Sequence, residues 1–228
     1  MIGNGTVPVR EVVRELFRFV LGSSLGRKVA TALAGLGALG FVLVHLAGNL
    51  VVCKGADAFS GYARSLHALP FLPLLEVALA CLFLLHISLG ILLTWQNWRA
   101  RPEPYALRQS AGAETFASRT MIYTGLCLLA FMLFHLWTVK IAPANTIPAY
   151  DRVMGVLSHP WLAVAYLLGV GALALHVSHG IAAALLSLGV RHPRHDAWLA
   201  LLGSFVAVAL AVGFTLVVLW FLYGKGHP

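Results

Sequence analysis

Four histidines stand deep inside stretches of the sequence that contain no charged residue. They are His45, His86, His135 and His176. An imidazole in such an apolar stretch cannot recover its hydration, and it is favoured there only as a neutral hydrogen-bonding or metal-binding group. One buried histidine is most often structural, hydrogen-bonded to a nearby backbone group or hydroxyl. Four of them, spaced regularly, point to a shared role.

The four histidines are related in pairs by one offset along the sequence. Residues 85–91 match residues 175–181 as Leu-His-(Ile/Val)-Ser-x-Gly-Ile, and residues 41–46 match residues 131–136 as Phe-x-Leu-x-His-Leu. Both matches have an offset of 90 residues, because 176 − 86 and 135 − 45 are equal. The same offset relates Gly35 to Gly125 and Pro70 to Pro160. The first four apolar segments are therefore predicted to be one helical hairpin used twice.

The composition predicts that these histidines are held by membrane helices. Of the 228 residues, 60% are hydrophobic and 11% are charged, and the mean hydropathy is +0.85, which excludes a soluble domain. A helix that crosses a bilayer needs about 20 apolar residues. Five uncharged runs are long enough: 29–53, 77–98, 120–139, 153–190 and 197–224. We predict an all-α membrane protein in which helices I–IV form a pseudo-two-fold bundle and helix V, which has no histidine, packs outside it.

The positive charges set the predicted orientation. With the N-terminus in the cytoplasm, eleven of the 16 Lys and Arg residues lie inside and five outside, so the C-terminus is predicted outside. This distribution explains why the 16 Lys and Arg residues outnumber the 8 Asp and Glu residues, and it requires no nucleic acid as a partner. Residues 9–20 form an amphipathic pattern that suits the membrane surface or the seat of a soluble partner. The predicted parts are thus a cytoplasmic segment, 1–27, and a transmembrane domain, 28–228.

The parallel sense of the repeat predicts what the histidine pairs do. Its pseudo-two-fold axis would run along the membrane normal, so equivalent residues share a depth and face each other across the axis. Each pair can then hold one iron. Two axial imidazoles on a haem leave the iron no open position, which suits electron transfer, and the apolar body of a haem fits inside a helical bundle.

Other metal sites fit the pattern less well. Zinc requires four ligands that converge on one point, whereas each histidine pair supplies two. Cys53, Cys81 and Cys127 are scattered singly, without the Cys-x-x-Cys spacing of an iron–sulfur cluster or zinc site. On helix IV the repeat selects His176 as the ligand, since His179 corresponds to Leu89. A structural role or a hydrogen bond to a haem propionate is expected for His179.

Counting residues from the inside charges orders the two pairs by depth. His45 and His135 lie 17 and 16 residues from Lys28 and Arg119, and His86 and His176 lie 13 and 15 from Arg99 and Arg191. His45 and His135 are therefore predicted to form the outer pair, and His86 and His176 the inner pair.

These motifs together resemble the cytochrome b membrane-anchor subunits of succinate dehydrogenase/fumarate reductase, in their five-helix, two-haem form. The resemblance rests on Ser-Ser-Leu-Gly-Arg-Lys at 23–28, His-Leu-Ala-Gly-Asn-Leu at 45–50, Gln-Asn-Trp-Arg-Ala-Arg-Pro at 96–102, Phe-His-Leu-Trp at 134–137 and His-Val-Ser-His-Gly at 176–180. These motifs follow the order of the family across helices I to IV.

The resemblance implies two haem b groups and a place in a larger complex. His86 and His176 would hold the haem nearer the flavoprotein and iron–sulfur subunits, and His45 and His135 the distal haem. The chain would be an electron-transfer subunit without the flavin chemistry, in a bacterial-type cytoplasmic membrane, and would react with a quinone such as menaquinone or ubiquinone. Some two-haem fumarate reductases have a Glu for proton movement two residues before the helix IV ligand. Here that position is Ala174, so the proton pathway is not carried over.

The resemblance also implies a quinone site near the distal haem. Quinone chemistry moves protons with electrons, so a titratable group must lie near the quinone oxygens and water. The outer candidates are His67 first, Glu76 second and His159 third. Glu76 is also explained by the helix N-terminus, and His67 by a solvated loop.

Two other functions stay open at this point. One is a cytochrome b anchor of another quinone-linked enzyme, such as a formate dehydrogenase or hydrogenase. The other is a non-haem membrane transporter, which predicts no b-type absorption bands.

Overall fold

A computed structural model describes residues 8–100, 116–141, 147–190 and 196–224 of the chain. Every element in these ranges is helical, and five helices are long and apolar enough to cross a membrane. This confirms the predicted all-α fold with five membrane-spanning helices. The five are α2 (Ser24–Asn49), α4 (Leu72–Ala100), α5 (Phe116–His135), α7 (Pro160–Ser187) and α8 (Asp196–Tyr223).

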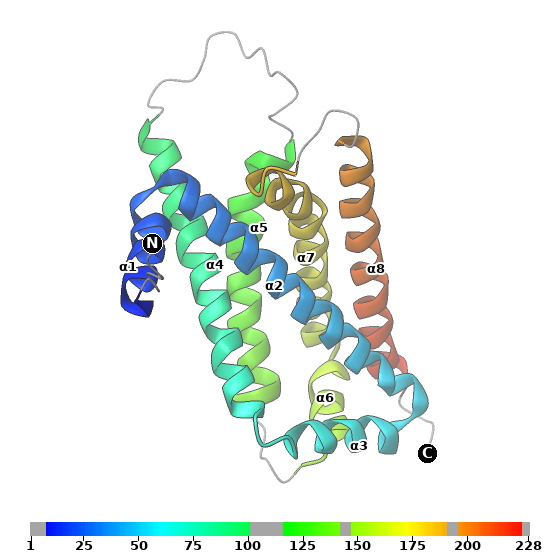
Figure 1. Ribbon diagram of the computed structural model, residues 1–228. Coiled ribbons are helices and arrows are strands. Elements are labelled where there is room, and N and C mark those ends of the chain that lie inside the picture. The colour runs from blue at the N-terminus through cyan, green and yellow to red at the C-terminus, as the bar shows by residue number, and fades with distance from the viewer. Residues whose placement is uncertain (1–7, 101–115, 142–146, 191–195, 225–228) are drawn as a thin grey trace, which may run out of the picture.

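The long helices are arranged as two hairpins covered by a fifth helix. α2 packs on α4, α5 packs on α7, and the hairpins meet mainly where α2 packs on α7 (Figure 1). α8 lies along α7 and also touches α2. The connection between α5 and α7 begins with a π-helical segment, η2 (Leu136–Ile141), and the connection between α2 and α4 begins with a 3-10 helix, η1 (Leu50–Lys54).

Two short helices close one end of the bundle where the sequence predicted loops. They are α3 (Ala56–His67) and α6 (Ala149–Leu157), and both lie at the bottom of Figure 1. Phe59 of α3 is buried against Phe221 of α8, with ring centroids 6.1 Å apart. We call this the α3/α6 end of the bundle, and the opposite end the α1 end.

The 90-residue offset extends to the short helices. Ser60 of α3 and Tyr150 of α6 are equivalent positions, since 150 − 60 is 90, and the backbone N–H of Tyr150 donates a hydrogen bond to Ser60 Oγ at 3.3 Å. Equivalent positions of a two-fold repeat can touch only close to the axis that relates them. The pseudo-two-fold axis therefore passes between α3 and α6.

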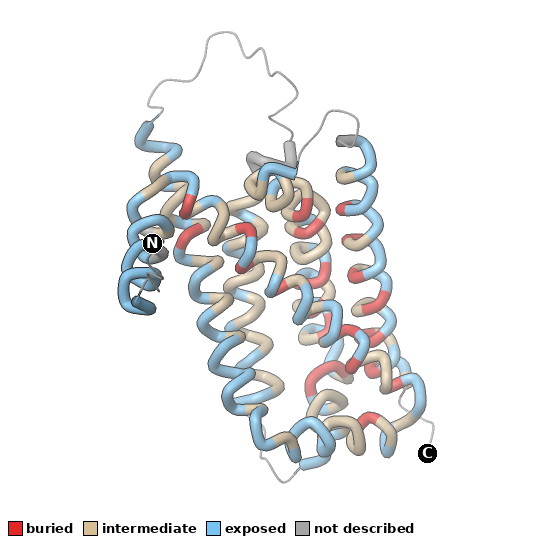
Figure 2. The backbone as a smooth tube through the Cα atoms, in the orientation of Figure 1, coloured by how far each residue is buried: buried red, intermediate tan, exposed pale blue. Residues whose placement is uncertain are grey.

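Burial is distributed unevenly over the five long helices. Figure 2 shows the buried positions gathered on α2, α7 and α8. Among the described residues, Leu89 alone is buried on α4 and none on α5. Leu210 and Phe221 of α8 are fully buried, so helix V contributes much of the core. The apolar outer faces of α4 and α5 suit contact with lipid, whose tails are as apolar as their side chains.

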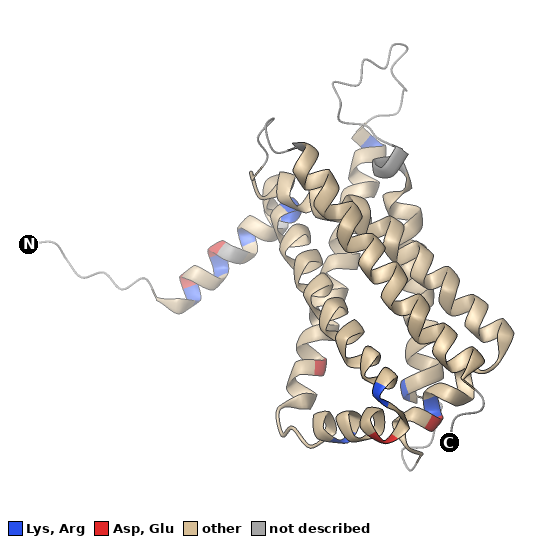
Figure 3. Ribbon diagram, turned by 90° about the vertical axis from the view of Figure 1, so that its right-hand side faces the viewer, with Lys and Arg blue, Asp and Glu red and all other residues tan. Residues whose placement is uncertain are grey.

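Charged residues lie at the two ends of the bundle and along its N-terminal helix, leaving the middle uncharged (Figure 3). The N-terminal helix is α1 (Val9–Gly22), in the stretch predicted to be an amphipathic helix. It packs on α2 and leans away from the bundle in Figure 3. The apolar side chains of Val9, Val12 and Phe17 on α1 are all exposed.

The turn between α1 and α2 explains one of the sequence motifs. Ser23 Oγ accepts a hydrogen bond from the Gly26 N–H at 2.8 Å and donates one to the Phe19 carbonyl at 2.9 Å. The same side chain therefore caps both the start of α2 and the end of α1. A Cβ on Gly26 would lie 2.0 Å from the Phe19 carbonyl oxygen. Only glycine fits this close approach of the two helices.

We expect the contact between α7 and α8 to depend on Gly203. A Cβ there would lie 2.6 Å from the backbone carbonyl oxygen of Ser178, so Gly203→Ala has to push the two helices apart. The cost of such overpacking is about 1–3 kcal/mol. The melting temperature of the detergent-solubilised protein should fall.

The matched control for this variant is Gly171→Ala on α7, where an added Cβ meets nothing within 4 Å. Both changes make the same gain in helix propensity. Equal melting temperatures for the two variants would contradict the proposed close packing.

Candidate functional site

The histidines of helices II and IV face each other near the α1 end. The ring centroids of His86 on α4 and His176 on α7 are 6.2 Å apart, and the ring planes are 86° to each other. His86 Nδ1 lies 3.0 Å from the backbone carbonyl oxygen of Thr31, near the start of α2. A Cβ on Gly35 would lie 2.7 Å from His86 Cε1. Glycine at this position therefore makes room for the imidazole against α2.

The second hairpin builds the same surroundings for His176. His176 Nδ1 lies 3.2 Å from Thr124 Oγ1 on α5, and the ring lies near the backbone of Met121. A Cβ on Gly125 would lie 3.4 Å from His176 Cε1. Met121 and Gly125 are the positions 90 residues after Thr31 and Gly35. Both hairpins therefore place the histidine against the same two positions of its partner helix.

The other two histidines form a second facing pair toward the α3/α6 end. The ring centroids of His45 on α2 and His135 at the end of α5 are 5.9 Å apart, with the planes at 78°. Each ring stacks on the phenylalanine four residues earlier. Phe41 lies 5.4 Å from His45 at 19°, and Phe131 lies 5.9 Å from His135 at 28°. Phe214 of α8 also touches His45, at 6.1 Å between centroids.

His135 has a hydrogen-bond partner in the opposite helix of its hairpin. Its Nδ1 lies 3.2 Å from Tyr166 Oη on α7, and Tyr166 Oη lies 2.7 Å from Thr138 Oγ1 in η2. Thr138 Oγ1 in turn donates to the Phe134 carbonyl at 3.0 Å. For His45, no hydrogen bond of a ring nitrogen exists within the described part of the chain; its carbonyl accepts from Asn49 Nδ2 at 2.8 Å.

Counting the protons in these contacts assigns the tautomers. The Thr31 carbonyl can only accept, so His86 Nδ1 carries the proton. With its one hydroxyl proton donated to the Thr120 or the Met121 carbonyl of its own helix, Thr124 accepts from His176 Nδ1. His135 Nδ1 donates to Tyr166 by the same reasoning. In all three rings Nε2 keeps its lone pair, which is the form that binds a metal.

Both pairs fit the dimensions of a metal with two axial imidazoles. Two imidazoles on opposite sides of one metal, each with a metal–nitrogen distance of about 2 Å, have ring centroids about 6 Å apart. The measured separations are 5.9 and 6.2 Å. All four rings are half-buried. Within the described ranges no three His, Cys, Asp or Glu side chains lie close enough to share a metal ion, so the candidate ligands come as pairs.

The remaining predicted residues lie around these pairs without joining them. His179 is half-buried one turn beyond His176, and no hydrogen bond of its ring is found among the described residues. His67, Glu76 and His159 all lie at the α3/α6 end. His67 Nδ1 bonds the Ala63 carbonyl at 2.8 Å, Glu76 forms an ion pair with Lys140 of η2, and His159 is exposed just before α7. No hydrogen bond or ion pair joins any two of the three in the part of the chain that the structure describes.

Sequence reasoning did not find every residue around the histidines. Tyr166, Thr124 and Thr138 were missed, although each is a polar residue inside an apolar run, which was an available signal. Phe214 was missed because helix V was expected only to pack. Arg101, Arg108, Arg191 and Arg194, which were assigned to the inside loops, lie outside the described residues.

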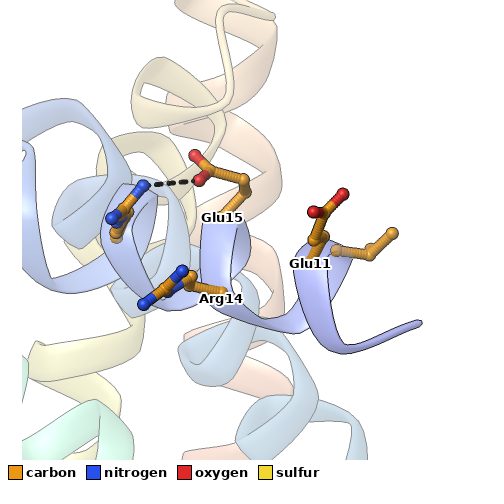
Figure 4. Close-up of a pocket in the computed structure, with 5 residues that line it drawn as sticks. Glu11, Arg14 and Glu15 are labelled. Atoms are coloured by element: carbon orange, nitrogen blue, oxygen red, sulfur yellow. Dashed lines mark hydrogen bonds and ion pairs between the residues drawn. The ribbon is translucent and has the colours of Figure 1, made fainter. Parts of the chain in front are cut away.

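One surface hollow lies apart from all of these residues. It is lined by Glu11, Val12, Arg14, Glu15 and Arg18, which all belong to α1 (Figure 4). Arg18 Nη1 and Glu15 Oε1 form an exposed ion pair at 2.8 Å across it. Such exposed pairs contribute little stability, and no histidine faces the hollow.

Two comparisons with known proteins give matches. The family described as Succinate dehydrogenase/Fumarate reductase transmembrane subunit matches residues 99–213, half of the chain, which include His135 and His176. The succinate dehydrogenase cytochrome b558 subunit of Bacillus subtilis (strain 168) is 26% identical over 147 residues, covering 62% of this chain and 68% of that protein. No solved structure matches significantly. The chain belongs to the family of succinate dehydrogenase/fumarate reductase transmembrane subunits.

Proposed function

We propose that this membrane subunit carries electrons between an iron–sulfur subunit and membrane quinone, through two haem b groups. The observation that supports this most directly is the pair of facing imidazoles at two levels of the bundle, with Nε2 free in three of the rings. His86 and His176 would hold one haem and His45 and His135 the other. The family assignment favours a succinate-linked complex over a formate dehydrogenase or hydrogenase anchor, and the histidine pairs give a transporter no support.

The side chains of this chain would do three things for such a group. A haem held by the two imidazoles of each pair would supply one-electron transfer. The histidines bind from opposite hairpins, so the separation of the hairpins sets the spacing of the ligands. The hydrogen bonds at Nδ1 keep each ring in one tautomer and orientation, which metal-bound histidines generally require. The apolar faces of the helices exclude water from the pairs.

The distribution of charge supports an orientation for the electron path. With the N-terminus in the cytoplasm, the α1 end and the His86/His176 pair lie inside. A soluble flavoprotein and an iron–sulfur subunit would then bind at this end. The exposed apolar face of α1 either forms part of that binding surface or lies in the lipid headgroup region. In a bacterial-type cytoplasmic membrane, the α3/α6 end faces outside.

We further propose that quinone reacts at the α3/α6 end, near His45 and His135. His67 and His159 are exposed there, and Glu76 carries a carboxylate on the first turns of α4. The ion pair with Lys140 of η2 holds the Glu76 carboxylate at this end of the bundle. Each of the three can exchange protons with water at this end.

The haem assignment predicts two low-spin b haems per chain. In the purified complex, the haem-to-chain ratio should be two, with no high-spin signal, because each iron has two imidazoles. His176→Ala should remove the inner haem and keep the outer one. His179→Ala, one turn away on the same helix, is the matched control and should keep both. A ratio of one, or loss of a haem only in His179→Ala, would contradict the pairing.

The orientation predicts which part of the chain the iron–sulfur subunit touches. Chemical cross-linking of the intact complex, followed by mass spectrometry, should join that subunit to residues 9–20 or 99–119. Cross-links solely from residues 54–72 or 141–160 would place the partner at the opposite end and reverse the orientation.

The quinone proposal predicts a selective loss of quinone turnover. In His67→Ala and Glu76→Gln, made separately, succinate oxidation with an artificial dye should survive. Quinone turnover should fall about a hundredfold in the variant that removes the proton-transfer group.

The control for the carboxylate is Lys140→Met, which breaks the same ion pair and retains Glu76. Spectra of each variant should still show both haems. Unchanged quinone turnover in both His67→Ala and Glu76→Gln would move the site to the α1 end.

A further inference from the structure

The hydroxyl of Tyr166 joins His135 to the π-helical segment that follows it. Tyr166 Oη lies 3.2 Å from His135 Nδ1 and 2.7 Å from Thr138 Oγ1. Thr138 donates its proton to the Phe134 carbonyl at 3.0 Å, or to the His135 carbonyl at 3.3 Å. With that proton placed on a carbonyl, Thr138 accepts from Tyr166, and Tyr166 accepts from His135. The three groups form a one-directional chain of hydrogen bonds that begins at the imidazole.

The surrounding packing holds the Tyr166 ring in place. The ring is buried, and it meets Phe131 edge-on at 5.3 Å between centroids and Phe134 at 5.6 Å. Both phenylalanines belong to α5, the helix of His135. The acceptor Thr138 lies in η2, where the helix widens directly after His135, and π-helical turns often occur at functional positions. The hydroxyl is thus fixed relative to the imidazole by contacts on both sides.

The repeat shows that this arrangement is present at one place only among the described residues. The position equivalent to Tyr166 is Glu76, because 166 − 90 is 76, and Glu76 is paired with Lys140. The position equivalent to Thr138 is Gly48, which has no hydroxyl. His45 accordingly has no ring hydrogen bond within the described ranges, whereas His86 and His176 both have one. In the outer pair one ring thus has a hydrogen-bond partner, whereas in the inner pair both rings have one.

We propose that Tyr166 is a positioning residue for His135 that lowers the reduction potential of a haem bound between His45 and His135. The proposal rests on the function proposed above. An acceptor at Nδ1 draws the proton away from the imidazole and makes Nε2 a stronger electron donor. A stronger donor stabilises the ferric state more than the ferrous state. Loss of the Tyr166 hydroxyl should therefore raise the potential of the outer haem.

The test is a redox titration of the purified complex carrying Tyr166→Phe, followed in the visible haem bands. Phenylalanine keeps the ring between Phe131 and Phe134 and removes only the hydroxyl. At a fixed ambient potential, the ratio of reduced to oxidised outer haem should rise by about fivefold to tenfold, tenfold being about 59 mV for one electron. The inner midpoint should stay unchanged. The outer haem is identified as the one that His176→Ala retains.

Two further variants separate this effect from general packing. Tyr150→Phe removes a hydroxyl from another aromatic cluster at the α3/α6 end, where Tyr150 meets Phe59 and Phe221, and should shift neither midpoint. Thr138→Val leaves Tyr166 in place but removes its acceptor, and should shift the outer midpoint in the same direction by less.

Three results decide the matter. An outer midpoint that is equal in Tyr166→Phe and Tyr150→Phe would overturn the role of Tyr166, while the two-haem function would stand. A shift of both midpoints by equal amounts would also overturn it, because the contact is local to His135. Fewer than two haems in the unsubstituted complex would instead refute the proposed function itself, before any variant is compared.

Discussion

A histidine N–H inside an apolar bundle costs free energy unless the fold supplies an acceptor, because no water is there to take it. For three of the four histidines the acceptor comes from the other helix of the same hairpin: the Thr31 carbonyl for His86, Thr124 for His176 and Tyr166 for His135. Each contact requires the two helices of a hairpin to lie close. The short approach is made possible by glycine at positions such as Gly35. The distance between the two helices of a hairpin and the orientation of the imidazole ring therefore depend on each other.

The offset of 90 residues made much of this arrangement predictable. It related the histidines in pairs, and the structure brings the members of each pair within about 6 Å. It also singled out Gly35 and Gly125, which prove to lie against His86 and His176. The binding of haem by these pairs stays a prediction, but the juxtaposition on which it depends follows from the repeat.

Other features could not be found from the sequence, for physical reasons. The role of the Thr31 carbonyl could not be predicted from the sequence, because every residue has a backbone carbonyl. Tyr166 lies where the repeat is broken, since its equivalent position is Glu76, so comparison of the halves did not select it. The short helices α3 and α6 bury only a few side chains each, Phe59 among them. Their composition is typical of loops, so the sequence did not predict them as helices. Helix V was expected only to pack, yet Phe214 touches His45.

The contact between Ser60 and Tyr150 has a consequence for how such a bundle can be built. In a dimer of two identical hairpins, a residue on the two-fold axis faces its own copy, so each contact must be self-complementary. Two histidines per hairpin would be enough to furnish both pairs, one ligand from each copy. Joining the hairpins in one chain removes the demand for self-complementarity. Equivalent positions are then free to diverge, as Ser60 and Tyr150 have, and the two histidines of one pair can have different surroundings.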